Sequence, residues 1–303
     1  MKTPFISIEK ITLLLAFLVV LIIWSTTPLA IQWSSVDSPL TSALLRMLIG
    51  ALFCAMTLIL LQRGLPFDRA AKKIYLLSGL SIFVCMTLFY SASQLIPSGW
   101  VAVLFGLSPL STGLFSAIVE PETKLTPSRI IGLLLGLSGL YLVSSAGLNF
   151  EDACLLAVTL VLCATLISSA SSVISRQLMK DQSLSGMQIT TGSLVVAIPC
   201  FALAVLVFEP GLNLSFSTQA MSAIVYLGFI GTGVGFTLYY YLLKRVSANR
   251  LSLVTLITPI TALSVGSLLN NEPLVPEVWM GASLVSIGLL LYEFKPKLGL
   301  RKL

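Results

Sequence analysis

Residues 88–111, LFYSASQLIPSGWVAVLFGLSPLS, align with residues 238–261, LYYYLLKRVSANRLSLVTLITPIT, at a constant offset of 150. The alignment pairs similar residues at three positions: Tyr90 with Tyr240, Ser108 with Thr258, and Pro109 with Pro259. Similarity continues beyond these segments, between the glycine-rich stretches 132–143 and 281–292. The chain therefore contains two related halves, which we place at residues 1–147 and 148–303.

Both halves have the composition of a membrane protein. The chain of 303 residues is 56% hydrophobic and only 10% charged, with a mean hydropathy of +0.99, whereas soluble domains are about 25% charged. Apolar segments of about 20 residues recur, and each is long enough to cross a ~30 Å hydrocarbon core. We predict an all-α integral membrane protein with ten transmembrane helices, at roughly 11–31, 40–61, 74–95, 99–119, 127–146, 153–175, 186–208, 219–243, 250–269 and 277–294.

The basic residues mark one side of this predicted membrane protein. If the N-terminus is cytoplasmic, every lysine and arginine except Arg46 falls in a cytoplasmic segment. The charged residues of the outer loops are then all acidic. Cytoplasmic loops of membrane proteins carry an excess of Lys and Arg, so the net charge of +6 reflects topology and does not indicate nucleic-acid binding. We expect both termini in the cytoplasm, in a bacterial-type cytoplasmic (inner) membrane.

Each half contains five predicted spans. Because five is odd, the second half must cross the membrane in the opposite direction to the first. The loops agree, since RGLPFDRAAKK (63–73) is basic whereas its counterpart EPGLNLSFSTQ (209–219) has no basic residue. Inverted repeats with a binding site between the halves are a transporter design. The predicted fold is therefore two inverted five-helix repeats.

Four motifs follow one another along the chain: WSTTPLAIQW (24–33), ALLRMLIGAL (43–52), two helices with a Ser/Thr-Pro step, and paired glycine-rich fifth and tenth helices. In this order and topology they resemble the EamA-type family of the drug/metabolite transporter superfamily, over essentially the whole chain. The resemblance implies ten helices, two cytoplasmic termini and a central cavity shared by the halves. Members of that family pass small metabolites, amino acids or drugs, very often outward.

Pro109 and Pro259 lie at the middle of the fourth and ninth predicted spans. A proline inside a helix removes a backbone donor and leaves the carbonyl four residues earlier unbonded. Irregular backbone at membrane depth is tolerated where protein or a watery cavity satisfies it. Two alternatives stay open: packing kinks satisfied by Ser108 and Thr258, or paired hinges beside a cavity that these two hydroxyls line.

Aromatic and hydroxyl residues in the spans are further cavity candidates. Trp24 lies past the middle of the first span and is followed by hydroxyl residues that include Thr27. A buried indole N–H requires a partner, and plain packing is the alternative for Trp24. Tyr240 lies near the cytoplasmic end of the eighth span, where an interfacial aromatic belt is the alternative. Its repeat counterpart Tyr90 is also a candidate.

Arg46 lies inside the second span, about 9 Å below the outer boundary at 1.5 Å per residue. A charge at the centre of a membrane helix costs about 3 kcal/mol on insertion scales and usually faces a partner or a cavity. Three roles stay open: snorkelling to the headgroups, binding a substrate carboxylate through two parallel donors, or bracing carbonyls freed near Pro28. Gln188 precedes a glycine by four positions as Arg46 does, so this counterpart is a cavity candidate as well.

The chain has no histidine, and no Asp or Glu lies in the middle of a predicted span. Proton-coupled transporters commonly carry such a relay group. Coupling would therefore use acids at the span boundaries, and Glu122 and Glu272 are the repeat-related pair. The five cysteines lack metal-ligand spacing, so we expect no metal site and no cofactor.

These patterns predict a secondary transporter that moves a small organic metabolite, amino acid-like, monoanionic or amphipathic, and exports it by alternating access. One arginine is poorly suited to phosphates, which require several basic groups. The alternatives are an intramembrane transferase, for which the spans lack acid–base groups, and a membrane receptor without transport. Expected partners are the substrate and the lipid bilayer, and a homodimer through helices five and ten stays open.

Overall fold

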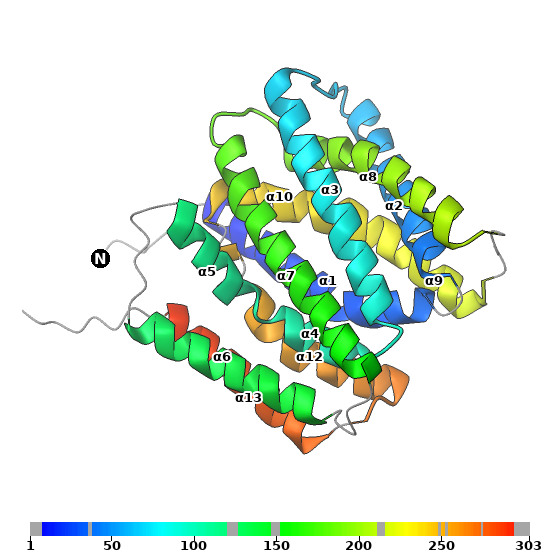
Figure 1. Cartoon of the computed structure of the whole chain (residues 1–303). Helices are drawn as coiled ribbons and strands as arrows, with labels where there is room; N and C mark the ends of the chain where they lie inside the picture. The colour runs from blue at the N-terminus through cyan, green and yellow to red at the C-terminus, as the bar shows by residue number, and fades with distance from the viewer. Residues whose placement is uncertain are drawn as a thin grey trace, which may run out of the picture.

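The computed structural model describes residues 8–35, 38–119, 127–146, 152–210, 216–247, 250–251, 254–273 and 275–293, and its regular secondary structure there is helical. Figure 1 shows that the helices form one bundle, in which they are inclined to one another. Their bounds are α1 (Ile8–Ser34), α2 (Pro39–Leu60), α3 (Arg69–Ala92), α4 (Ser98–Phe105), α5 (Ser108–Val119), α6 (Pro127–Ala146), α7 (Asp152–Met179), α8 (Gly186–Phe208), α9 (Thr218–Tyr226), the π-helix η1 (Leu227–Val234), α10 (Gly235–Arg245), α12 (Val254–Asn270) and α13 (Pro276–Glu293).

Seven helical stretches are long and apolar enough to cross a membrane. One of them joins α4 with α5, and another joins α9, η1 and α10. Three shorter apolar helices lie at Pro127–Val143, Ile257–Asn270 and Pro276–Tyr292. The chain is therefore a helical multi-pass membrane protein, and the predicted count of ten spans stays a prediction because these three helices are shorter.

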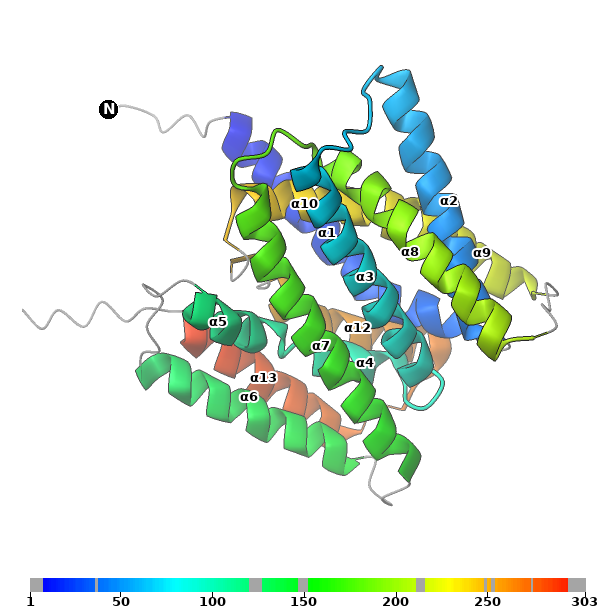
Figure 2. The same cartoon turned by 45° about the horizontal axis from the view of Figure 1, so that its top comes forward.

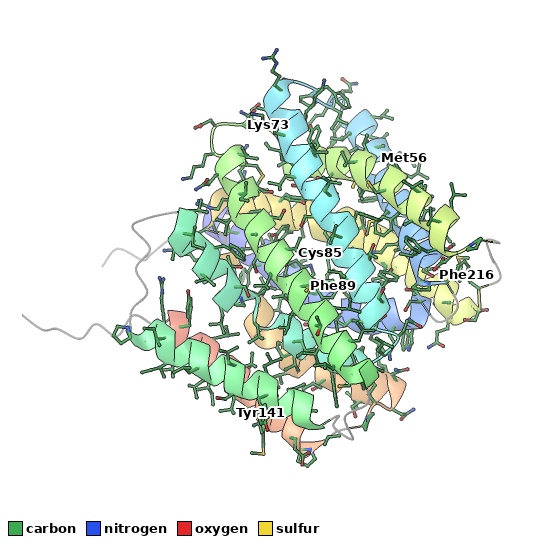
Figure 3. The ribbon with its side chains drawn as sticks, in the orientation of Figure 1. Met56, Lys73, Cys85, Phe89, Tyr141 and Phe216 are labelled. Atoms are coloured by element: carbon green, nitrogen blue, oxygen red, sulfur yellow. The ribbon has the colours of Figure 1, made fainter. Side chains whose placement is uncertain are left out.

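The outer surface of the bundle is apolar. Ile59 on α2, Ile118 on α5 and Leu206 on α8 are 74%, 70% and 67% exposed. Figure 3 shows Tyr141 at the periphery, whereas Phe89 lies inside the bundle. Large exposed apolar surfaces indicate contact with a membrane or another apolar partner, as expected for helices surrounded by lipid.

Loops rich in basic residues meet at one end of the bundle. Arg176 Nε donates to the carbonyl of Val246 at 2.7 Å, and Lys244 Nζ donates to the carbonyl of Leu184 at 3.0 Å. These bonds tie the end of α7 to the end of α10, and the end of α10 to the segment before α8. We call this the basic end.

The opposite end carries acids that cap helices. Glu209, at the end of α8, accepts hydrogen bonds from the backbone N–H groups of Leu40 and Thr41, both at 2.9 Å. The first N–H groups of a helix have no partner inside it, and a negative charge is favourable beside them. We call this the acidic end, and Glu272, described below, also lies there.

Helices α6 and α13 run antiparallel along one edge of the bundle (Figures 1 and 2). A Cβ built on Gly132 would lie 2.4 Å from the Gly288 carbonyl oxygen, and one on Gly139 would lie 2.5 Å from that of Gly281. Small residues permit such close approach of membrane helices. The glycine faces of α6 and α13 therefore pack against each other within one chain. The homodimer stays a prediction, and it would use the outer faces of these two helices.

The interior lies between two groups of helices. α1 packs against α12, α10 and α4, and α3 packs against α7 and α8. Figures 1 and 2 both show α1 behind α3 and α7. The candidate site lies in this interior.

Candidate functional site

Two adjoining cavities lie inside the bundle. The first reaches toward the basic end, because Ser175 and Leu251 line it. The second reaches toward the acidic end, because Ile31 and Ser93 line it. We call them the basic-end cavity and the acidic-end cavity.

The cavities meet at a shared group of large side chains, which we call the aromatic partition. Five residues line both cavities: Trp24, Met86, Phe89, Phe105 and Phe236. The Phe105 ring centroid lies 6.1 Å from that of Trp24 and 5.2 Å from that of Phe89, both in edge-on geometry. Such ring pairs contribute roughly 0.5–1.5 kcal/mol beyond area burial. The partition draws on α1, α3, α4 and α10, so both halves of the chain build it.

Arg46 on α2 lines the acidic-end cavity and is 1% exposed. Its Nε donates to Thr232 Oγ1 at 2.9 Å, its Nη1 lies 3.7 Å from Met86 Sδ, and its guanidinium carbon lies 6.0 Å from the Phe236 ring centroid. All three partners are neutral. A guanidinium has five N–H donors, and a buried charge is costly unless it is paired. The arrangement therefore favours an anionic group in this cavity.

The π-helix η1 brings Thr232 to Arg46. A Cβ on Gly228 would lie 2.6 Å from Ile49 Cβ on α2, and one on Gly231 would lie 3.3 Å from Arg46 Nη2. The absence of side chains at these glycines allows η1 to pack closely against α2. Single π-helical turns occur frequently at functional sites. The position of the guanidinium thus depends on contact between helices from different halves.

The three roles considered for Arg46 fit this geometry unequally. Snorkelling requires a head group that reaches the membrane surface, whereas this side chain is buried. Bracing takes a different form from the one expected, because the Nε bond goes to Thr232 in η1 and not to carbonyls near Pro28. A carboxylate site stays a prediction, and the place of Arg46 in the cavity wall favours it.

The structure brings six of the eight predicted substrate-binding residues to the cavities. Ser108 and Tyr240 line the basic-end cavity, Thr27, Arg46 and Thr258 line the acidic-end cavity, and Trp24 lines both. These residues come from five different helices, so the prediction included side chains that are distant in sequence. Their role in binding stays a prediction.

The other two predicted residues lie outside the lining of both cavities. Tyr90 is fully buried, and its hydroxyl has no hydrogen-bond partner among the described residues. Gln188 lies at the basic end, where its Oε1 accepts from the Ser185 N–H at 2.9 Å and its Nε2 donates to the Gly64 carbonyl at 2.7 Å. This geometry gives Gln188 a helix-capping role.

The two predicted proline hinges have different surroundings. α4 ends at Phe105 and α5 begins at Ser108, so the helix is interrupted just before Pro109. α12 instead continues through Pro259. The two segments lie against each other, because a Cβ on Gly106 would lie 3.0 Å from Pro259 Cγ. The hinge role stays a prediction, and the interruption favours Pro109.

Glu272 caps the start of α4. Its carboxylate accepts from the Ser98 N–H at 3.1 Å, the Ser98 hydroxyl at 2.6 Å and the Gly99 N–H at 3.1 Å. These bonds satisfy free amides at the helix start, and Glu272 lies outside the lining of both cavities. Glu122, its repeat counterpart, lies outside the described residues. The coupling role of this pair stays a prediction.

Sequence reasoning missed the hydroxyl-rich face of α7. Five of its serines line the basic-end cavity: Ser168, Ser169, Ser171, Ser172 and Ser175. The available signal was the run ISSASSVIS (167–175), which places many hydroxyls in one apolar span. The signal is weak, because a serine in a helix can bond to its own backbone and so need no other partner.

A multi-pass helical bundle with two adjoining internal cavities, one of them holding a buried arginine, has the features of a membrane transporter. The model of the EamA-like transporter family matches residues 10–145 and 155–294. The chain belongs to the EamA-like transporter family, and the resemblance noted in the sequence is confirmed. It is a membrane transporter.

Individual relatives are similar over most of their length. The uncharacterized transporter YoaV of Bacillus subtilis is 24% identical over 290 residues, which cover 94% of this chain and 97% of that protein. The probable amino-acid metabolite efflux pump of Escherichia coli is 22% identical over 213 residues, which cover 68% of this chain and 71% of that protein. A solved crystal structure with a TM-score of 0.72 and 20% identity covers 93% of this chain and 97% of its own, which shows the shared fold.

Proposed function

We propose that this membrane protein is a secondary transporter that exports a small organic metabolite. Transport proceeds by alternating access between two inverted five-helix repeats, residues 1–147 and 148–303, with ten transmembrane helices in all. The observation that carries the proposal is the pair of cavities on either side of the aromatic partition. Substrate would pass from one cavity to the other as the helices that form the partition rearrange.

The packing of the helices supports the inverted repeats. If the two halves are exchanged, α1 corresponds to α7, α3 to α10, and α4 to α12. The contact of α3 with α7 then corresponds to that of α10 with α1, and the contact of α1 with α12 corresponds to that of α7 with α4. The contacts of α2 with α8, α4 with α12 and α6 with α13 map onto themselves. A contact pattern unchanged by this exchange is expected of a pseudo-two-fold axis in the membrane plane. The two stretches matched by the family model, 10–145 and 155–294, suggest the same division.

The charge of the two ends supports the orientation. We place the basic end in the cytoplasm because cytoplasmic loops carry the excess of Lys and Arg. This orientation puts both termini in the cytoplasm and Arg46 in the outer half of the protein. The bacterial sources of YoaV and of the efflux pump support a cytoplasmic (inner) membrane location.

The substrate class follows from the lining of the acidic-end cavity. Arg46 would bind one carboxylate, and the rings of the aromatic partition would contact an apolar part of the same molecule. An amino acid-like, monoanionic or amphipathic metabolite has both features. Export is supported by the name of the E. coli relative, a probable amino-acid metabolite efflux pump.

Flux in proteoliposomes tests the proposal. A thermal-shift screen against metabolites selects the cargo, because a ligand that binds the folded state raises its apparent stability. We expect the selected metabolite to cross the membrane down its gradient and to be recovered unchanged. Recovery of a chemically altered product would indicate the transferase alternative, and binding without flux would indicate a receptor.

The same liposomes test the energy source. Because the cavity linings contain no acidic residue in the part of the chain that the structure describes, we expect flux driven by a substrate gradient to persist when the pH gradient is collapsed. A rate that follows the pH gradient and is lost in Glu272→Gln or Glu122→Gln would instead indicate coupling through these boundary acids.

A further inference from the structure

The basic-end cavity differs in chemistry from the acidic-end cavity. Its lining residues are hydroxyl-bearing, aromatic or apolar, and none of those described carries a charge. The guanidinium of Arg46 belongs to the lining of the other cavity. The two cavities therefore offer different partners to a substrate.

The serine hydroxyls of α7 donate their protons to backbone carbonyls. Ser172 Oγ donates to the Ser169 carbonyl at 2.8 Å, and Ser168 Oγ donates to the Thr165 carbonyl at 3.1 Å. Ser169 Oγ donates to the Ser108 carbonyl at 3.3 Å. A carbonyl can only accept and a hydroxyl has a single proton. These three serine oxygens are therefore left as acceptors.

Ser168, Ser169 and Ser172 all line the basic-end cavity. Their acceptor oxygens favour a ligand that donates hydrogen bonds.

Aromatic rings add to this preference. Tyr239 has its ring centroid 5.5 Å from that of Trp24 and 5.2 Å from that of Tyr240, and all three line the basic-end cavity. A cation over the face of Trp or Tyr is attracted by the ring quadrupole, and the attraction increases when the site is desolvated.

We propose that the basic-end cavity is a subsite for an organic ammonium group of the substrate. An ammonium has three donors and no acceptor, which matches the acceptor oxygens of Ser168, Ser169 and Ser172, and its charge suits the aromatic rings. The proposal rests on the proposed transport function and deepens it. The substrate binds with its ammonium toward the basic end, while its carboxylate, if it has one, lies toward Arg46 beyond the aromatic partition.

Three probes that share a phenyl ring and a short linker test the subsite: phenethylammonium, phenethyl alcohol and phenylacetate. Titration calorimetry on the purified full-length protein should give phenethylammonium an affinity roughly tenfold higher than that of phenethyl alcohol, because hydrogen bonds to a charged group are stronger than those to a neutral one. Ser169→Ala combined with Ser172→Ala should remove most of this difference. The affinity for phenylacetate should fall in Arg46→Gln and should not change in the double serine variant.

Thr165→Val is the matched control. Thr165 is a buried hydroxyl residue on the same helix that donates to the Val161 carbonyl at 2.7 Å, and it lies outside the lining of both cavities. This variant should keep the preference for the ammonium probe. Equal affinity of the wild-type protein for the ammonium and the alcohol, no binding of the ammonium probe, or the same loss in Thr165→Val would each overturn the subsite.

The outcome can be separated from that of the transport proposal. If a metabolite crosses proteoliposome membranes but the protein does not distinguish the ammonium from the alcohol, transport stands and the subsite is wrong. If the ammonium preference is found and depends on Ser169 and Ser172 but no metabolite crosses, the subsite stands and the transport proposal is wrong.

Discussion

Replacing Arg46 tests the proposed carboxylate site. Arg46→Lys keeps the charge but loses the planar fork, and Arg46→Gln removes the charge and copies the repeat counterpart. A hydrogen bond to a charged group contributes roughly 1.5–3 kcal/mol. We therefore expect a carboxylate-bearing substrate to bind about tenfold more weakly to Arg46→Lys, and more weakly still to Arg46→Gln. Titration calorimetry on purified protein measures both values.

The amidated form of the same substrate is the control ligand for Arg46. Because it lacks the negative charge, its affinity should change little in either variant. If both ligands lose affinity equally and the melting temperature also falls, Arg46 serves mainly to join α2 to η1 through Thr232. Wild-type affinity for the carboxylate in Arg46→Gln would contradict the assignment of this residue to a substrate site.

The sequence indicates some residues of the candidate site and not others, and the reasons are physical. Arg46 stands out because a lone basic residue inside an apolar span has to be explained by a partner or a cavity. Gln188 was included by repeat analogy, but the start of α8 lies at the basic end, where Gln188 bonds to Ser185 and Gly64, and the start of α2 lies at the acidic end. Ser169 and Ser172 left no distinctive pattern, because their hydroxyls bond to backbone carbonyls.

Among the helices, the pairing of α6 with α13 gives a prediction about stability. In Gly139→Ala the new Cβ would lie 2.5 Å from the Gly281 carbonyl oxygen, so the helices must separate. Overpacking of this kind typically costs about 1–3 kcal/mol. We expect a lower melting temperature of the detergent-purified protein. Gly64→Ala is the control, because a Cβ there meets nothing within 4 Å, and equal effects of the two changes would contradict the close pairing.

The interruption between α4 and α5 gives a second prediction about helices. Pro109→Ala restores an N–H that can bond to the Phe105 carbonyl, so it favours a continuous helix. We expect a severalfold lower rate of flux in proteoliposomes with little change in substrate affinity. Pro259→Ala should have a smaller effect, since α12 is already continuous there. A normal rate in Pro109→Ala would show that the interruption is not a hinge.

The positions of several helices follow closely from hydropathy, whereas their irregularities do not. The expected spans 40–61, 127–146 and 186–208 agree with Pro39–Leu60, Pro127–Ala146 and Gly186–Phe208 to within one residue at each end. Hydropathy measures apolarity and not backbone hydrogen bonding. For this reason Pro109 gave the only indication of the α4–α5 interruption, and the π-helix η1 was not predicted.

For the whole molecule, the orientation in the membrane can be tested with reporters. A reporter fused after Arg250 should read cytoplasmic and one fused after Glu209 should read external, because basic loops stay on the cytoplasmic side. A fusion after Lys124 is the control and should agree with the one after Arg250. An external signal at Arg250 would contradict the inverted repeats, since this loop and the segment 94–100 must lie on opposite sides.

The cavities are the property of the whole molecule that the sequence predicted least completely. The repeat alignment indicated a site between the halves and included Ser108 and Thr258, and the position of Trp24 in the first span indicated that residue; all three line the cavities. Phe89, Phe105 and Phe236, which with Trp24 and Met86 form the aromatic partition, gave no local signal, because an aromatic residue in an apolar span is typical of any packed or lipid-facing helix. Their meeting depends on how distant helices pack.

The acidic caps indicate which helices we expect to move together during transport. Glu209 of the second half binds the start of α2, and Glu272 of the second half binds the start of α4. Each cap joins helices that also pack along their length, α2 with α8 and α4 with α12. We therefore expect the rigid bodies of the transport cycle to be these cross-half pairs, so that neither half, expressed as a separate polypeptide, would contain one complete moving part.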